Sequence, residues 1–130
     1  MLPKALAEVT SNQHYVGVTF RLKKGETKNL VVYSDQWNFT GKTLIMTIKY
    51  QVNLVDTYIT LSSIGDSPKI FVPQNNIGRL EVGLSAETTQ NWPFDFAKYE
   101  IVSESGSTPN KIRELLLEGS IIMTPLERRV

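Results

Sequence analysis

The amino-acid sequence predicts an all-β protein: an antiparallel β-sandwich of immunoglobulin-like type, with about seven to eight strands and little helix. Apolar and polar residues alternate with period two over much of the chain. Turn-forming residues interrupt this alternation about every 10 to 15 residues, which is the spacing of short strands. The few helical candidates are too short to form a layer. The same pattern is also compatible with a small half-open barrel.

The alternation is clearest in three stretches, YVGVTFRLKK (15–24), TLIMTIKYQV (43–52) and RLEVGL (79–84). In the first, Val16, Val18, Phe20 and Leu22 share one face. Successive side chains of a strand point to opposite faces, so each stretch predicts a strand with one buried and one solvated face. This arrangement favours antiparallel sheets, because parallel sheets are usually covered on both faces.

The remaining elements follow in chain order. Shorter strands are expected at residues 29–33, 57–62, 69–72 and 98–103. Turns are expected at KKGET (23–27), NFTGK (38–42), IGDSP (64–68), PQNNIG (73–78) and ESGSTPN (104–110), the first of them as a hairpin turn. Two short helical turns are possible, at residues 2–9 and at residues 85–92, where the Ser85 hydroxyl can cap the helix.

The last strand is expected to run from about residue 112 to 124. Its alternation places one set of residues in the core, namely Leu115, Leu117, Gly119, Ile121 and Met123. The opposite face then carries Leu116, Glu118, Ser120 and Ile122. Gly119 allows a bulge or the close approach of a neighbouring strand. Pro125 cannot donate to a strand ladder and is expected to end the pairing.

The 130 residues predict a single β-sandwich domain at 15–125, preceded by an N-terminal arm at 1–14 and followed by a short polar tail at 126–130. The chain has no cysteine, so disulfides and thiolate chemistry are excluded, as in many proteins made in a reducing cytoplasm. No apolar run is long enough to span a bilayer, and residues 1–15 lack the continuous apolar core of a signal peptide. We therefore expect no membrane partner.

The charge distribution gives no indication of nucleic-acid binding. The net charge is +1, and the first 65 residues carry 7 basic and 4 acidic side chains against 7 and 9 in the rest. A nucleic-acid surface requires a concentrated basic face, which this distribution does not provide.

Catalytic and metal chemistry have few candidate residues. His14, the only histidine, lies in a polar lead-in and is expected at the surface rather than in a triad or a metal site. Four carboxylates, Glu100, Glu104, Glu114 and Glu118, cluster in the last third of the chain and raise the hypothesis of a hydrolase. The alternation turns Glu118 outward, which favours a solvated carboxylate. The sequence therefore assigns no catalytic, cofactor-binding or metal-binding residue and predicts no enzyme.

Aromatic residues suggest a second kind of site. Trp37, Trp92, Phe94 and Phe96 are candidates for a platform that stacks on a sugar or a base, with Phe94 and Phe96 on one face. The competing interpretation is that these rings close the ends of the sandwich. The triplet Asn38–Phe39–Thr40 matches a glycosylation sequon, but with Gly41 it is better interpreted as a turn.

Five segments follow one another along the chain: KKGET (23–27), FTGKTLIMTIKY (39–50), LSAETT (84–89), FAKYEIVSE (96–104) and LLLEGSIIMTP (115–125). In this order they resemble small β-sandwich proteins of tailed bacteriophages and prophages, in particular the N-terminal domain of baseplate upper proteins and related tail or neck accessory proteins. The first fifteen residues have no counterpart in this pattern.

The resemblance implies a non-enzymatic virion structural protein of the tail, baseplate or neck, made in the bacterial host cytoplasm and without cofactors. Its partners would be other virion structural proteins, and a homo-oligomer or ring-associated copy is expected because such assemblies are symmetric. Residues 1–14 and 124–130 would provide contacts. The alternative is a carbohydrate-binding module that recognises a bacterial surface glycan through Trp37, Trp92 or Phe94.

Overall fold

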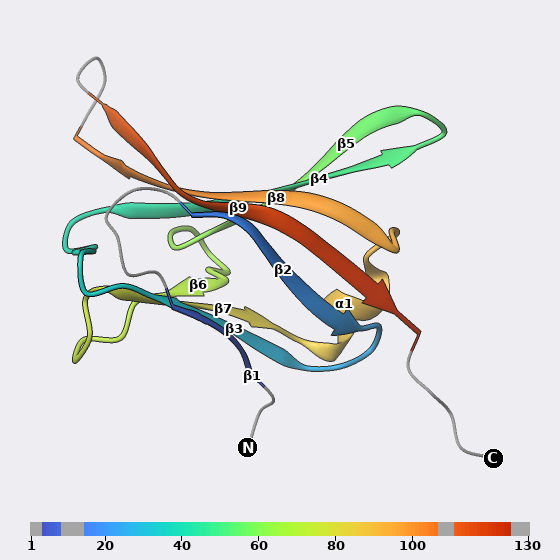
Figure 1. Ribbon diagram of the computed structural model, residues 1–130, viewed down its shortest axis with the longest axis horizontal. Coiled ribbons are helices and arrows are strands. Elements are labelled where there is room, and N and C mark those ends of the chain that lie inside the picture. The colour runs from blue at the N-terminus through green and yellow to red at the C-terminus, as the bar shows by residue number, and fades with distance from the viewer. Residues whose placement is uncertain (1–3, 9–14, 107–110, 126–130) are drawn as a thin grey trace.

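The computed structural model describes residues 4–8, 15–106 and 111–125, with residues 4–8, 15 and 16 described by their backbone. It contains two stacked sheets (Figure 1). The four-stranded sheet has the order β1-β3-β7-β6, formed by β1 (Lys4–Glu8), β3 (Lys28–Tyr33), β7 (Arg79–Leu84) and β6 (Ile70–Phe71). The five-stranded sheet has the order β2-β9-β8-β4-β5, formed by β2 (Tyr15–Lys23), β9 (Ile112–Thr124), β8 (Phe96–Ser105), β4 (Thr43–Val52) and β5 (Val55–Ser62).

The predicted all-β sandwich is therefore confirmed, with one difference in strand direction. Most neighbouring strands are antiparallel, but β1 pairs with β3 in parallel and β2 pairs with β9 in parallel. The expected hairpin turn at residues 23–27 is wrong, because β2 and β3 do not pair with each other. It joins β2 of one sheet to β3 of the other, so it crosses between the sheets.

The space between the sheets is filled by the side chains that the period-two pattern predicts to point inward. Leu44, Met46 and Ile48 of β4 are fully buried, as are Leu80 and Val82 of β7. On β9, Leu117, Ile121 and Met123 are buried, while Glu118, Ser120 and Ile122 are only partly covered. The period-two pattern thus identified the buried face of the central strands.

Leu116 is a correction to that pattern. It was expected on the solvated face, yet it is 3% exposed and belongs to the core, whereas Leu115 is only half-buried. The register explains this, since Ile101 pairs with Leu117 and Val102 pairs with Leu115, which leaves Leu116 as the extra residue of a β-bulge. A bulge shifts the alternation by one residue.

At Gly119, a neighbouring strand approaches closely, as expected from the sequence for a residue without a side chain. A Cβ at this position would lie 1.8 Å from the carbonyl oxygen of Val18 in β2. Gly17 is the extra residue of a second bulge there, with φ of +88°. Tyr99 pairs with Gly119 across the β8–β9 ladder, and its hydroxyl donates to the Val18 carbonyl at 2.9 Å. An aromatic residue opposite a glycine covers the exposed backbone, so these residues attach the edge strand β2 to the sheet.

The single helix of the described residues, α1 (Ala86–Asn91), confirms the predicted capped turn. The Ser85 side chain accepts a hydrogen bond from the Thr88 N–H at 3.1 Å. The other expected helical turn, at residues 2–9, is wrong: Lys4–Glu8 forms β1, whose parallel pairing with β3 outweighs a weak local helix propensity.

Candidate functional site

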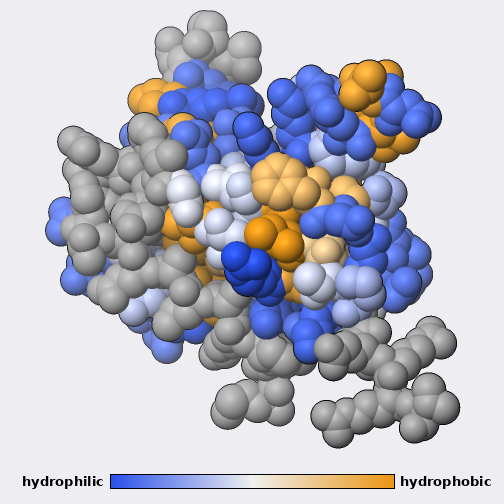
Figure 2. Space-filling model, turned by 45° about the vertical axis from the view of Figure 1, so that its right-hand side comes forward, coloured by the Kyte–Doolittle hydropathy of each residue, from blue (hydrophilic) through white to orange (hydrophobic). Residues whose placement is uncertain are grey.

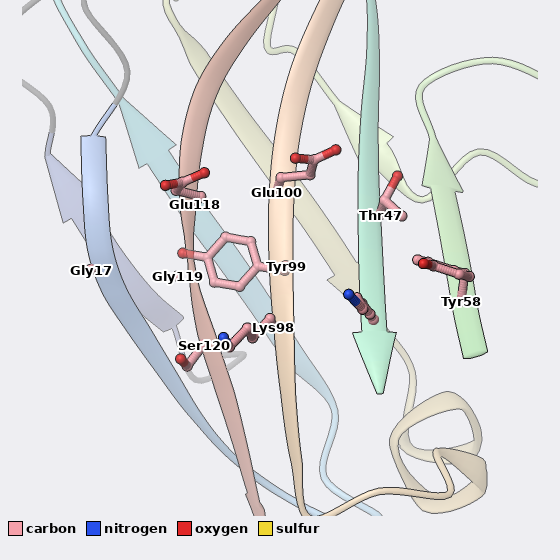
Figure 3. A pocket seen from close by; sticks show the side chains of 10 residues that line it. Gly17, Thr47, Tyr58, Lys98, Tyr99, Glu100, Glu118, Gly119 and Ser120 are labelled. Carbon is pink, nitrogen blue, oxygen red and sulfur yellow. The ribbon is translucent and has the colours of Figure 1, made fainter. Parts of the chain in front are cut away.

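A shallow hollow of about 450 Å³ lies on the outer face of the five-stranded sheet (Figure 3). Two rows of side chains cross it from strand to strand. One row contains Thr47 on β4, Glu100 on β8 and Glu118 on β9, which are successive partners across the ladders. The adjacent row contains Tyr58, Lys49, Lys98 and Ser120, from β5, β4, β8 and β9 respectively. The hollow therefore places an acidic row beside a basic one.

The two carboxylates of the hollow lie side by side on the outer face of the sheet (Figure 3). Glu100 is exposed and Glu118 is half-buried. Within the described residues, neither of them lies within ion-pair distance of a basic side chain. Like charges that face each other across a ladder repel, so this arrangement costs stability.

This arrangement does not resemble a hydrolytic cleft. A glycosidase holds its two carboxyl groups on either side of the scissile bond, in a site that encloses the substrate. Here both side chains point the same way from an open sheet surface. The paired rows of charge instead suit contact with a charged protein surface.

The other two candidate carboxylates lie apart from this hollow. Glu104 is 8% exposed, and its carboxylate accepts hydrogen bonds from the Nε and Nη2 atoms of Arg113 and lies 3.3 Å from the Lys111 ammonium. The hydrogen bonds from Arg113, followed by those from Lys111, hold the pKa of Glu104 below its usual value, although desolvation opposes them. Glu114 is exposed and pairs with Ser103. The four carboxylates thus do not form one site.

The aromatic candidates are mostly buried. Trp37, Trp92 and Phe94 are 7%, 5% and 6% exposed, whereas Phe96 is 54% exposed. Trp92 stacks on Phe94, with ring centroids 5.4 Å apart, and Trp37 packs against Phe39 at the same separation. The expectation that Phe94 and Phe96 share a face is wrong, because Phe94 precedes β8 and turns into the core. Three of the four rings therefore pack within the protein.

Two further expectations concern single residues. Asn38 forms the predicted turn, since its side-chain oxygen accepts a hydrogen bond from the Thr40 N–H at 3.0 Å. His14 lies outside the described residues, as does most of the arm and all of the tail at 126–130. No group of three or more His, Cys, Asp or Glu side chains suited to a metal ion occurs among residues 4–8, 15–106 and 111–125. No helix of these same ranges has the length and apolar character needed to cross a membrane.

The exposed tip of the β4–β5 hairpin was not singled out from the sequence. It carries Val52, Leu54 and Val55, which are 44%, 90% and 63% exposed. Asn53 and Leu54 form a two-residue turn, and both have positive φ (51° and 68°). The detectable signal was a leucine at a turn position where Asn-Gly is usual.

Comparisons with known proteins agree with the fold. No protein-family model matches the chain, and no curated protein sequence matches it. Among solved structures, the chain is similar to the N-terminal domain of phage TP901-1 ORF48, with a TM-score of 0.58 and 8% sequence identity. The match covers 94% of this chain and 98% of that domain. At this identity the likeness shows the fold, which is that of a domain of a phage protein.

Proposed function

We propose that this chain is a non-enzymatic structural component of a tailed-phage virion, in the tail, baseplate or neck, that mediates protein–protein assembly. The main support is the similarity of its fold, over nearly the full length of both, to a domain of a phage protein. The five sequence segments, which resemble baseplate upper proteins and related accessory proteins, support the same class.

The surface supports a role in assembly. The β4–β5 hairpin extends beyond the rest of the sandwich (Figure 1). Figure 2 shows hydrophobic atoms at the end of this projection, where Leu54 is 90% exposed. Apolar side chains gathered on a protruding element mark a contact site for another protein. The open hollow beside it adds charged groups for specificity.

The test is incorporation of the chain into particles. Gradient-purified tailed particles of the source phage should contain the chain by mass spectrometry, and removing its gene should give incomplete particles. Leu54→Asp should lower incorporation severalfold, because it places a charge in the proposed contact. Thr40→Asp, in an exposed turn just before the start of β4 and so away from the hairpin tip that follows its end, serves as the matched control. Absence of the wild-type chain from intact particles would contradict the proposal.

A deletion of residues 1–12, which the sequence alone suggests as a test of the arm, is less informative. This deletion also removes β1, whose five residues pair with β3. Loss of assembly would then have two explanations, a missing contact or a damaged sheet. The hairpin substitution avoids this ambiguity because Leu54 lies outside the core.

One observation favours glycan binding as a second function. The indole N–H of Trp37 is buried and lacks a hydrogen-bond partner within the described residues. Trp37 lines a polar hollow with Gln36, Asn38 and Asn76. The indole nitrogen has no exposed surface, so a sugar hydroxyl in this hollow would bond that N–H only after the Trp37 ring or the hollow shifts. A glycan array would test this: binding that Trp37→Phe abolishes supports it, and no binding to host polysaccharides contradicts it.

A further inference from the structure

Strand β5 is the last strand of the five-stranded sheet, and within the described residues its outer edge is open and lacks the usual protection. Natural edge strands carry charges, prolines or bulges, or are very short, and these features block pairing with other chains. At the opposite edge, β2 has a bulge at Gly17 and carries Arg21 and Lys23. In the other sheet, β6 has only two residues. By contrast, β5 is eight residues long, with the sequence VDTYITLS, and contains no proline and no basic residue.

The single charge on β5 is already engaged within the hairpin. The Asp56 carboxylate accepts a hydrogen bond from the Gln51 amide at 3.1 Å and lies 3.4 Å from the Lys49 ammonium. These groups, with the Gln51 hydrogen bond contributing most, hold the pKa of Asp56 below its usual value. The carboxylate thus stays ionised, and its charge is balanced by the Lys49 ammonium within the hairpin.

The hydrogen-bond alternation shows which backbone groups are free. The Ser63 N–H donates to the Leu44 carbonyl at 3.0 Å, so residues 44 and 63 form a bonded pair. Bonded and non-bonded pairs alternate in an antiparallel ladder, so Thr57, Ile59 and Leu61 direct their N–H and C=O groups at β4. Asp56, Tyr58 and Thr60 therefore direct theirs at the open edge.

A second contact supports this alternation. The Lys69 N–H donates to the Ser62 carbonyl at 3.0 Å. Ser62 has the same parity as Asp56, Tyr58 and Thr60, and its carbonyl is indeed bonded on the side away from β4. In the part of the chain that the structure describes, the same side remains open along residues 56–60, where Asp56, Tyr58 and Thr60 are exposed.

We propose that β5 pairs antiparallel with β5 of a second copy of this chain and joins the two five-stranded sheets across a two-fold axis. With the axis at Tyr58, the residues that face outward match each other: Tyr58 faces Tyr58 of the second copy, and Asp56 faces Thr60. The two aspartates are thus kept apart, and two half-exposed aromatic rings meet, a favourable cross-strand pair. A C2 interface needs this kind of self-complementary patch.

The expected association is weak and reversible in the isolated chain. Pairing over about five residues buries much less than the roughly 1,200 Å² of a stable interface, which places it among weak, transient contacts. Higher local concentration in an assembly would favour the pair. The inference deepens the assembly role proposed above but rests on the edge geometry alone.

The experiment combines sedimentation with amide exchange in the full 130-residue chain. Sedimentation velocity between about 5 and 500 μM should show a monomer–dimer equilibrium. Amide exchange at Tyr58 and Thr60 should slow as concentration rises. Exchange at Thr57 and Ile59 should not change with concentration, because these amides already bond to β4.

A matched pair of substitutions tests whether dimerisation depends on the edge of β5. Thr60→Lys places a charge on β5 and should abolish the dimer over this range, with an unchanged circular dichroism spectrum. Thr47→Lys places the same charge on β4, directly opposite Thr60 and on the same face, and should dimerise like the wild type. A wild-type chain that stays monomeric at 500 μM, or equal dimerisation by both variants, would overturn the pairing. Neither result would decide the proposed virion role, which is tested separately by the presence of the chain in particles.

Discussion

At the scale of single residues, glycines and turn positions decide how closely the strands approach. Gly119 is the tightest of these positions, because a Cβ there would overlap backbone atoms of Val18. The Tyr99 hydroxyl bonds the same Val18 carbonyl. The attachment of β2 thus depends on one missing side chain and one hydrogen bond.

Gly119→Ala should therefore lower the free energy of unfolding by about 3 kcal/mol, as expected for severe overpacking. Urea denaturation monitored by circular dichroism measures this change. Gly83→Ala is the matched control, since a Cβ at this other strand glycine would meet only the Phe71 ring at 3.5 Å. Equal stability of the two variants would show that β2 does not approach β9 as described.

Leu54 offers the opposite case, a residue whose replacement should stabilise the protein. Its φ of 68° is a left-handed conformation that costs a residue with a Cβ about 1 kcal/mol. Leu54→Gly creates the preferred Asn-Gly turn and should raise the thermal midpoint by a few degrees. Leu54→Ala keeps the strain while removing the exposed side chain, so it should give no comparable gain.

At the scale of elements, the short helix α1 connects the two sheets. The Thr89 hydroxyl, which is fully buried, donates to the Glu26 carbonyl at 2.8 Å and accepts from the Gly25 N–H at 3.1 Å. Gly25 and Glu26 form the crossing from β2 to β3. Two of the five segments of the phage-like pattern, at 23–27 and 84–89, thus contact each other.

Thr89→Val, which keeps the shape but removes the hydroxyl, should cost about 1 kcal/mol, because it leaves partly buried backbone groups of Gly25 and Glu26 without this partner. Thr89→Ser retains the hydroxyl and should lose less. Equilibrium urea unfolding compares the two variants. Equal stability of Thr89→Val and Thr89→Ser would show that the hydroxyl does not stabilise the connection from β2 to β3.

At the scale of the whole molecule, the charged end of the β8–β9 hairpin links stability to pH. The pKa of Glu104 is lower in the folded chain than in the unfolded chain, chiefly through hydrogen bonds from Arg113. The unfolded state therefore binds more protons, and stability falls as pH decreases through the range below the usual value of 4.5.

Glu104→Gln should lower stability at pH 7 and flatten its decline between about pH 5 and pH 3. Glu114→Gln removes an equal charge from an exposed neighbour and should keep the wild-type slope. Urea midpoints at several pH values measure both slopes. A wild-type slope in Glu104→Gln would show that another carboxylate causes the decline.

Much of the fold could be predicted from the sequence because strands carry a local signal. The bounds of the strand at 112–124 and the Ser85 cap depend on neighbouring residues alone, and both are confirmed. The candidate site was harder to predict from the sequence. The sequence drew attention to Glu100 and Glu118, but it did not predict that they are direct partners across β8 and β9. The exposed hairpin tip and the free edge of β5 were not identified, because exposure depends on what packs nearby.

By itself, the sequence determined the all-β class and the faces of the central strands, since alternation acts over a few residues. At position 119 it indicated a close approach, but the fold decided that the approaching strand is β2. Only the tertiary structure decided the parallel pairing of β2 with β9, the bulge that buries Leu116 and the burial of the Trp37 and Trp92 rings. These features depend on contacts between segments far apart in the chain, for which a period-two pattern holds no register information.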